Sequence, residues 1–90
     1  MNYVQGKSDK NITLYALSTC GWCKKTRQIL DEMEMAYRYE YVDLLEGEER
    51  EEAVRIVSLW NPENSFPTLI VGEEAVAGYK EDKIRELLRY

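Results

Sequence analysis

The chain has 90 residues, and its 12 Lys and Arg residues against 17 Asp and Glu residues give a formal net charge of −5. A chain of this length supplies one hydrophobic core rather than two, so we expect a single domain over residues 1–90, with residues 1–10 as a polar N-terminal extension. The acidic balance argues against nucleic acid and against an anionic membrane surface as partners, because both favour a basic protein face.

The chain contains no histidine. This excludes catalysis by a Ser-His or Cys-His pair, and it excludes zinc or haem sites that need a histidine ligand. No apolar run is long enough to cross a bilayer, and the N-terminus lacks the apolar segment of a signal peptide. We therefore expect a cytoplasmic protein, in a compartment that keeps thiols reduced.

The first part of the chain predicts two strands and two helices. Residues 11–17, NITLYAL, form a nearly continuous apolar run, which is typical of a strand buried on both faces. Residues 37–43, YRYEYVD, alternate aromatic side chains with others and indicate a second strand. Helices are expected directly after Cys20 and over residues 47–60, because mostly apolar residues recur there at i, i+3, i+4 and i+7, which places them on one face of a helix. The residues expected on these two inward faces are Thr26, Ile29, Leu30 and Met33, and Ala53, Ile56, Val57 and Trp60.

The rest of the chain predicts a loop, a hairpin and a last helix. Asn, Pro and Ser mark residues 61–67 as a loop, and the runs TLIVG and AVA around a short turn indicate a β-hairpin. Residues 80–89 form the last helix. The order is β-α-β-α-β-β-α, in which a right-handed helical crossover makes the first two strands parallel. The expected fold is α/β, a four-stranded mixed sheet with helices on both faces.

Cys20 and Cys23, the two cysteines of the chain, lie at the junction of the first strand and the first helix. Free backbone N–H groups and the positive end of the helix dipole favour a thiolate at Cys20, and Lys24 and Lys25 add positive charge. Cys23 follows about one turn later, a separation that suits a disulfide. We expect Cys20 to be exposed, readily deprotonated and nucleophilic, and Cys23 to be more buried and to resolve the mixed disulfide. The alternative is an inert pair or half of a metal site.

The segments CGWC, SFPT and VAGYKEDKI, in this order and spacing, resemble the glutaredoxins of the thioredoxin superfamily. The resemblance covers residues 11–90 and implies the thioredoxin-like fold and a dithiol disulfide reductase that carries electrons. Pro67 matches a family proline with a cis peptide bond beside the reactive cysteine, and this geometry leaves the backbone of Phe66 free to pair with substrate. The other residues expected to bind substrate are Thr19, Gly21, Trp22, Lys24, Thr68, Gly78, Tyr79, Lys80 and Glu81.

The chain also departs from the common glutaredoxin pattern. Gly21 and Trp22 stand where glutaredoxins usually have Pro-Tyr, and Leu17 stands where members that use glutathione commonly have a lysine. The segment AGYKEDKI resembles that of NrdH-redoxins, which donate electrons to ribonucleotide reductase and accept them from thioredoxin reductase. The reductant therefore stays open between thioredoxin reductase and glutathione or another small thiol.

The resemblance implies a monomer that reduces disulfide-bearing proteins, ribonucleotide reductase among the candidates, with no bound cofactor beyond its own Cys20–Cys23 disulfide. An alternative from another class is an iron–sulfur carrier. Some glutaredoxins hold a [2Fe-2S] cluster across a dimer, with the first cysteine of each chain and two glutathione thiols as ligands. Cys23 argues against this role, because such a carrier needs one cysteine per chain.

Overall fold

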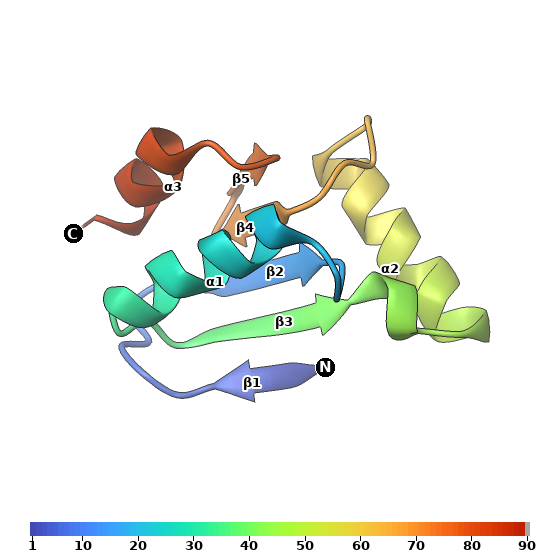
Figure 1. The fold of residues 1–90 in the computed structure, drawn as a ribbon, viewed down its shortest axis with the longest axis horizontal. Helices are drawn as coiled ribbons and strands as arrows, with labels where there is room; N and C mark the ends of the chain where they lie inside the picture. Colours follow the sequence, from blue (N-terminus) through green and yellow to red (C-terminus); the bar gives the residue numbers. More distant parts are fainter. Residues whose placement is uncertain (90) are drawn as a thin grey trace.

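The structure, a computed structural model, describes residues 1–89. Five strands form one sheet in the order β1-β3-β2-β4-β5, and three α-helices pack on it (Figure 1). The strands are β1 (Asn2–Val4), β2 (Ile12–Ala16), β3 (Tyr37–Tyr41), β4 (Thr68–Val71) and β5 (Glu74–Ala77). The helices are α1 (Gly21–Glu32), α2 (Gly47–Trp60) and α3 (Glu81–Leu88), with a short 3-10 turn, η1 (Val42–Leu44), after β3.

The strand directions confirm the mixed sheet. β2 and β3 are parallel and are connected by α1, whereas β4 pairs antiparallel with both β2 and β5. Gly72 lies in the turn of the β4–β5 hairpin with a φ of +62°, a conformation that glycine adopts without steric cost. This topology is the expected thioredoxin-like one.

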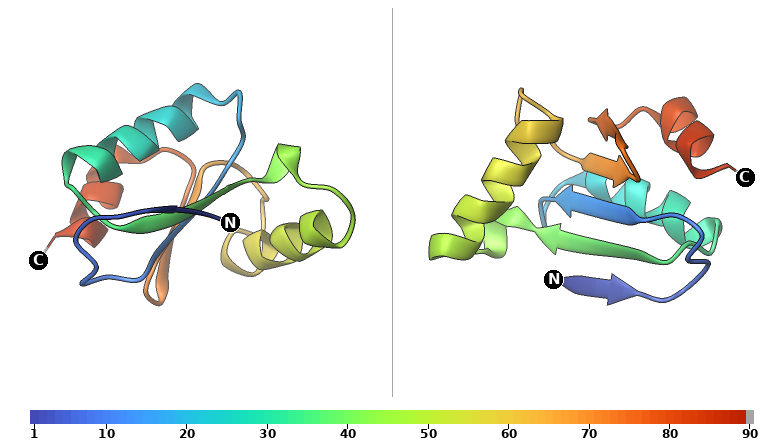
Figure 2. Two further views of the ribbon diagram at one scale, coloured as in Figure 1. Left: turned by 90° about the horizontal axis from the view of Figure 1, so that it is seen from below. Right: turned by 180° about the vertical axis from the view of Figure 1, so that it is seen from behind.

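Helices cover both faces of the sheet, as the burial of β2 on both faces requires. α1 and α3 lie on one face and α2 lies on the other (Figure 2). Successive residues of β2 point to opposite faces. Leu14 belongs to the core under α1 and α3, with Leu30 and Ile84, whereas Tyr15 belongs to the smaller core under α2, with Val57.

The expectation of four strands is wrong, because residues 2–4 add a fifth strand at the edge of the sheet. β1 pairs antiparallel with β3, and two backbone hydrogen bonds extend the contact: Lys7 N–H to Glu34 O and Ala36 N–H to Lys7 O, both 2.8 Å. Gly6 permits this close approach, since a Cβ there would lie 2.5 Å from Glu34 O. The sequence does not predict this strand, because its side chains show no hydrophobic periodicity. Backbone hydrogen bonds hold it in the sheet instead.

Two helix predictions need smaller corrections. Trp60, placed on the inward face of the second helix, is the last residue of α2 and is 38 % exposed, because the helix ends as it leaves the sheet. Lys80 lies before the first turn of α3 as its N-cap, so the helix begins one residue later than expected. Among residues 1–89, none of the helices combines the length and the hydropathy that crossing a membrane requires.

Candidate active site

Helix α1 begins at Gly21, and the sulfur of the preceding residue, Cys20, caps it. Cys20 is the N-cap of α1 with extended backbone angles, and its Sγ accepts a hydrogen bond from the Cys23 backbone N–H at 3.3 Å. The turn that precedes the helix is closed by a bond from Cys20 N–H to Leu17 O, also 3.3 Å. A sulfur in this position faces the unpaired N–H groups and the positive end of the dipole, which stabilise an anion.

Cys23 lies in a different environment, one turn along the same helix. It is 1 % exposed, whereas Cys20 is partly exposed, and both are free thiols. Burial is the largest cause that raises the pKa of the Cys23 thiol well above its ordinary value, and a hydrogen bond with Cys20 adds to it. A backbone hydrogen bond from Leu17 acts in the opposite direction. The protein therefore holds Cys23 protonated near neutral pH, beside a surface sulfur at a helix end.

The segment before β4 lies against the same core as the two cysteines. The peptide bond between Phe66 and Pro67 is cis, as the resemblance implied. Phe66 and Cys20 both pack, partly buried, against the core cluster that contains Cys23. Pro67 O accepts a hydrogen bond from Gly78 N–H at 2.8 Å, and Thr68 pairs with Ala77 in the sheet. The loop before β4 is thus tied to the segment that leads into α3.

The buried side chain of Asn61 holds this loop by hydrogen bonds, a role that sequence reasoning missed. The side chain is 2 % exposed, and its Nδ2 donates to Ser65 O, Ser65 Oγ and Thr68 Oγ1 at 2.9–3.0 Å. Thr68 Oγ1 in turn donates to Ser65 O at 2.8 Å. Nothing in the segment NPENSFP distinguishes a buried asparagine from a solvated loop asparagine, so the pattern alone did not reveal this role.

An aromatic pair joins the start of α1 to the segment before α3. Trp22 is 56 % exposed, and its ring stacks on that of Tyr79 with centroids 5.1 Å apart. Lys25 Nζ lies 4.9 Å from the Trp22 ring centroid, a cation–π distance. Gly78, with a φ of +78°, turns the chain so that Tyr79 reaches this position.

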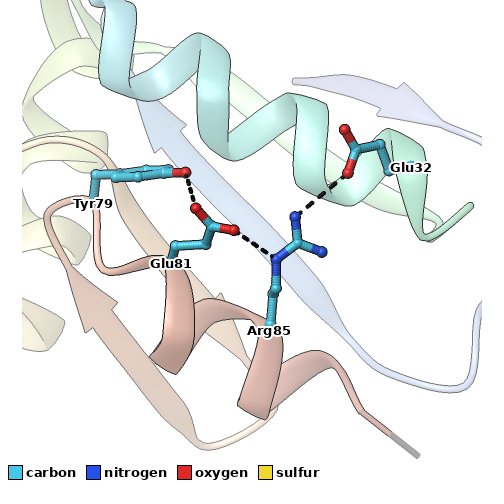
Figure 3. Close-up of polar contacts among 4 residues, drawn as sticks. All are labelled: Glu32, Tyr79, Glu81 and Arg85. Atoms are coloured by element: carbon cyan, nitrogen blue, oxygen red, sulfur yellow. Dashed lines mark hydrogen bonds and ion pairs between the residues drawn. The ribbon is translucent and has the colours of Figure 1, made fainter.

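A chain of polar contacts continues from the aromatic pair along α3 and back to α1 (Figure 3). Tyr79 OH donates to Glu81 Oε1 at 3.1 Å, and Arg85 Nε donates to Glu81 Oε2 at 3.0 Å. Arg85 Nη2 also reaches Glu32 Oε2, at the end of α1, at 3.4 Å. The hydrogen bonds from Arg85 and Tyr79 lower the pKa of Glu81. Glu81 is thereby held as an anion in the first turn of α3.

The structure brings the predicted site residues Trp22 and Tyr79 into contact and packs Cys20 and Phe66 against one core, and it separates one predicted residue from them. Thr19 is exposed in the turn before Cys20, Gly21 is the first residue of α1, and Lys80 is exposed before α3. Lys24 instead lines a hollow on the β3 side of α1, with Arg27, Gln28, Asp31 and Tyr41. It therefore faces away from Tyr79 and the start of α3.

Sequence reasoning also missed a contact between Ser18 and Asp43. Ser18 N–H and Ser18 Oγ donate to the two carboxylate oxygens of Asp43, at 2.8 and 2.5 Å. A signal for it was present. Ala16 pairs with Tyr41 in the parallel ladder, and each missed residue follows its strand by two positions. The carboxyl ends of neighbouring parallel strands meet at one edge of a sheet, where polar side chains often gather.

The fold and this arrangement place the chain in the class of thioredoxin-fold proteins with a Cys-x-x-C dithiol at a helix start. The family model for glutaredoxin matches residues 12–76. The solved glutaredoxin of Methanosarcina mazei Go1 is 48 % identical, with a TM-score of 0.91 over 99 % of this chain and 87 % of that one. Methanoredoxin of Methanosarcina acetivorans is 46 % identical, with a TM-score of 0.88 over 94 % and 90 % of the two chains.

A third solved structure, the glutaredoxin of Archaeoglobus fulgidus, is 34 % identical, with a TM-score of 0.84 over 91 % of this chain and 89 % of that one. Among curated protein sequences, none matches the chain. The protein belongs to the glutaredoxin family, whose members are in general thiol–disulfide oxidoreductases.

Replacing Asn61 by Ala tests the support of the loop before β4. The substitution removes the donor to the buried Thr68 hydroxyl and one of the two donors to the Ser65 carbonyl, so we expect the free energy of unfolding to fall by about 1–3 kcal/mol. Denaturant unfolding measures this loss. Asn2→Ala, at an exposed position with one long hydrogen bond of 3.5 Å, is the matched control and is expected to change stability by less than about 0.5 kcal/mol. Equal effects of the two substitutions would contradict the role of Asn61.

Proposed function

We propose that this protein is a dithiol disulfide reductase and electron carrier that works through Cys20 and Cys23. The observation that carries the proposal is the contrast between the two sulfurs: one is partly exposed and caps a helix, and the other is buried one turn later. Thiol–disulfide exchange needs this division between an attacking thiolate and a resolving thiol that stays protonated until it is used.

In the first step, the Cys20 thiolate attacks one sulfur of a substrate disulfide and releases the other as a thiolate. A mixed disulfide between Cys20 and the substrate results. In the second step, the Cys23 thiol loses its proton to solvent and attacks Cys20 Sγ, which releases the second substrate sulfur as a thiolate. The substrate has gained two electrons, and the protein now holds a Cys20–Cys23 disulfide that an external reductant must reduce.

The surroundings of Cys20 suggest how a disulfide substrate is held. We assign the backbone N–H and C=O of Phe66 to pairing with an extended substrate, since this residue precedes the cis-proline and packs against the same core as Cys20. The stacked rings of Trp22 and Tyr79 offer a flat apolar contact beside it. The remaining residues assigned to substrate contact are Thr19, Gly21, Gly78, Lys80 and Glu81. Lys24, on the other side of α1, and the buried Thr68 are not assigned to it.

For recycling, we favour an enzyme of the thioredoxin reductase type over glutathione. Leu17 lacks the charge that would pair with a glutathione carboxylate. Glu81, held by Tyr79 and Arg85, and Asp82 place carboxylates in the first turn of α3, where another carboxylate would be repelled. A protein disulfide, such as that of ribonucleotide reductase, is the proposed substrate, and the reducing cytoplasm is the proposed setting.

Serine variants of the two cysteines test the proposed division of roles. Cys20→Ser is expected to abolish reduction of a protein disulfide, because the attacking sulfur is gone. Cys23→Ser is expected to accumulate a mixed disulfide between Cys20 and the substrate, because nothing resolves it. Non-reducing electrophoresis and mass spectrometry detect the trapped species. Loss of exchange in Cys23→Ser together with full activity in Cys20→Ser would reverse the assignment.

The reductant is tested by dividing oxidised protein into two portions. One receives reduced glutathione, and the other receives NADPH with thioredoxin reductase, while the appearance of free thiols is followed. We expect rapid reduction by the enzyme and slow reduction by glutathione, because the carboxylates of glutathione meet Glu81 and Asp82. The variant Glu81→Gln controls for this repulsion and is expected to speed the reaction with glutathione alone. Rapid reduction of the unaltered protein by glutathione would contradict the preference.

A further inference from the structure

Ser18 and Asp43 join the carboxyl ends of β2 and β3 beside the dithiol. Asp43 accepts two hydrogen bonds from one residue, the backbone N–H and the hydroxyl of Ser18. These bonds hold the pKa of the Asp43 carboxyl below its ordinary value, so Asp43 is ionised throughout the neutral pH range. Asp43 itself is exposed, and burial does not force the pair to form.

The turn that Asp43 holds contacts both cysteines. Ser18 is a central residue of the turn from Leu17 to Cys20, which the bond from Cys20 N–H to Leu17 O closes. The Leu17 backbone also lies close enough to the Cys23 thiol to lower its pKa. A displacement of Ser18 therefore moves Cys20 through the chain and moves the Leu17 backbone relative to Cys23.

We propose that Asp43 is a positioning residue for the closure of the Cys20–Cys23 disulfide: by holding Ser18, it fixes the turn that sets the two sulfurs against each other. The inference rests on the proposed dithiol function and concerns its second step. There the Cys23 thiolate, formed by loss of its proton to solvent, attacks Cys20 Sγ, and the bond from Cys20 to the substrate sulfur breaks. The Cys23 sulfur, the Cys20 sulfur and the substrate sulfur must be collinear for this attack, so a small displacement of the turn slows the closure of the disulfide.

The charge of Asp43 acts in the opposite direction to its hydrogen bonds. Together with burial and the Cys20 sulfur, this charge raises the pKa of the Cys23 thiol and so disfavours the attacking thiolate. Charge alone would make Asp43 a hindrance to closure. The two effects are separable, because an asparagine at position 43 can still accept from Ser18 N–H and donate to Ser18 Oγ, and it carries no charge.

The test uses an aromatic disulfide that releases a coloured thiolate. Reduced protein releases one equivalent when Cys20 attacks and a second when Cys23 closes the ring, and stopped-flow absorbance resolves the two phases. We expect Asp43→Ala to slow the second release about tenfold or more and to change the first by less than about threefold. Asp43→Asn should restore the second release to the rate of the unaltered protein or slightly above it. Ser18→Ala, which keeps the backbone bond, should lie between them.

Glu73→Ala, an exposed acidic position in the β4–β5 turn, is the matched control and should leave both phases unchanged. An unaltered second release in Asp43→Ala overturns the proposal. Equal slowing in Asp43→Ala and Asp43→Asn would show that hydrogen bonds from position 43 do not restore closure, and this result also overturns the proposal. Equal slowing of both phases in Asp43→Ala overturns it as well. Absence of a second release from the unaltered protein would instead show that the dithiol mechanism itself fails.

Discussion

The hydrogen bond from Cys23 N–H to Cys20 Sγ is the interaction on which the candidate site depends. It places a sulfur where helices usually have an oxygen from Ser, Thr, Asp or Asn, so the start of α1 is capped by the sulfur that we propose as the nucleophile. The same bond fixes the spacing between the two cysteines, because its donor belongs to one and its acceptor to the other. The capping of the helix and the pairing of the two cysteines thus follow from one local geometry.

The core, the loop before β4 and the turn before Cys20 hold this geometry in place. β2 brings the chain to the start of α1 between two cores, and Leu14, Leu30 and Ile84 fix α1 and α3 against one face of the sheet. The loop before β4 is held by Asn61, and the turn before Cys20 is held by Asp43. Polar contacts position both of these segments, and in the loop before β4 the packing of Phe66 against the core adds to them.

Much of this architecture follows from the sequence because hydrophobic burial dictates it. The apolar run of residues 11–17 predicts the central strand, and the helical period of residues 47–60 predicts α2. The position of Cys20 between a strand and a helix predicts a dithiol at the start of α1. β1 could not be predicted in this way, since backbone hydrogen bonds to β3 hold it and its side chains are mostly exposed.

The supporting residues of the site show the same limit. The roles of Asn61 and of the Ser18–Asp43 pair depend on segments that meet only in the folded chain. For Asn61 no local pattern marks the difference between a buried and a solvated side chain. For Ser18 and Asp43 the signal lay in the register of two parallel strands, which becomes visible only when both strands and their pairing have been assigned.

The central claim is that the fold makes the two cysteines chemically unequal. Limited alkylation of the reduced, folded protein tests it directly, with less than one equivalent of iodoacetamide at neutral pH and tandem mass spectrometry to locate the label. Fully denatured protein, in which both thiols are free in solvent, is the control and should be labelled at both positions. The account predicts that nearly all of the label in the folded protein is on Cys20. Equal labelling of Cys20 and Cys23, or preferential labelling of Cys23, would contradict it.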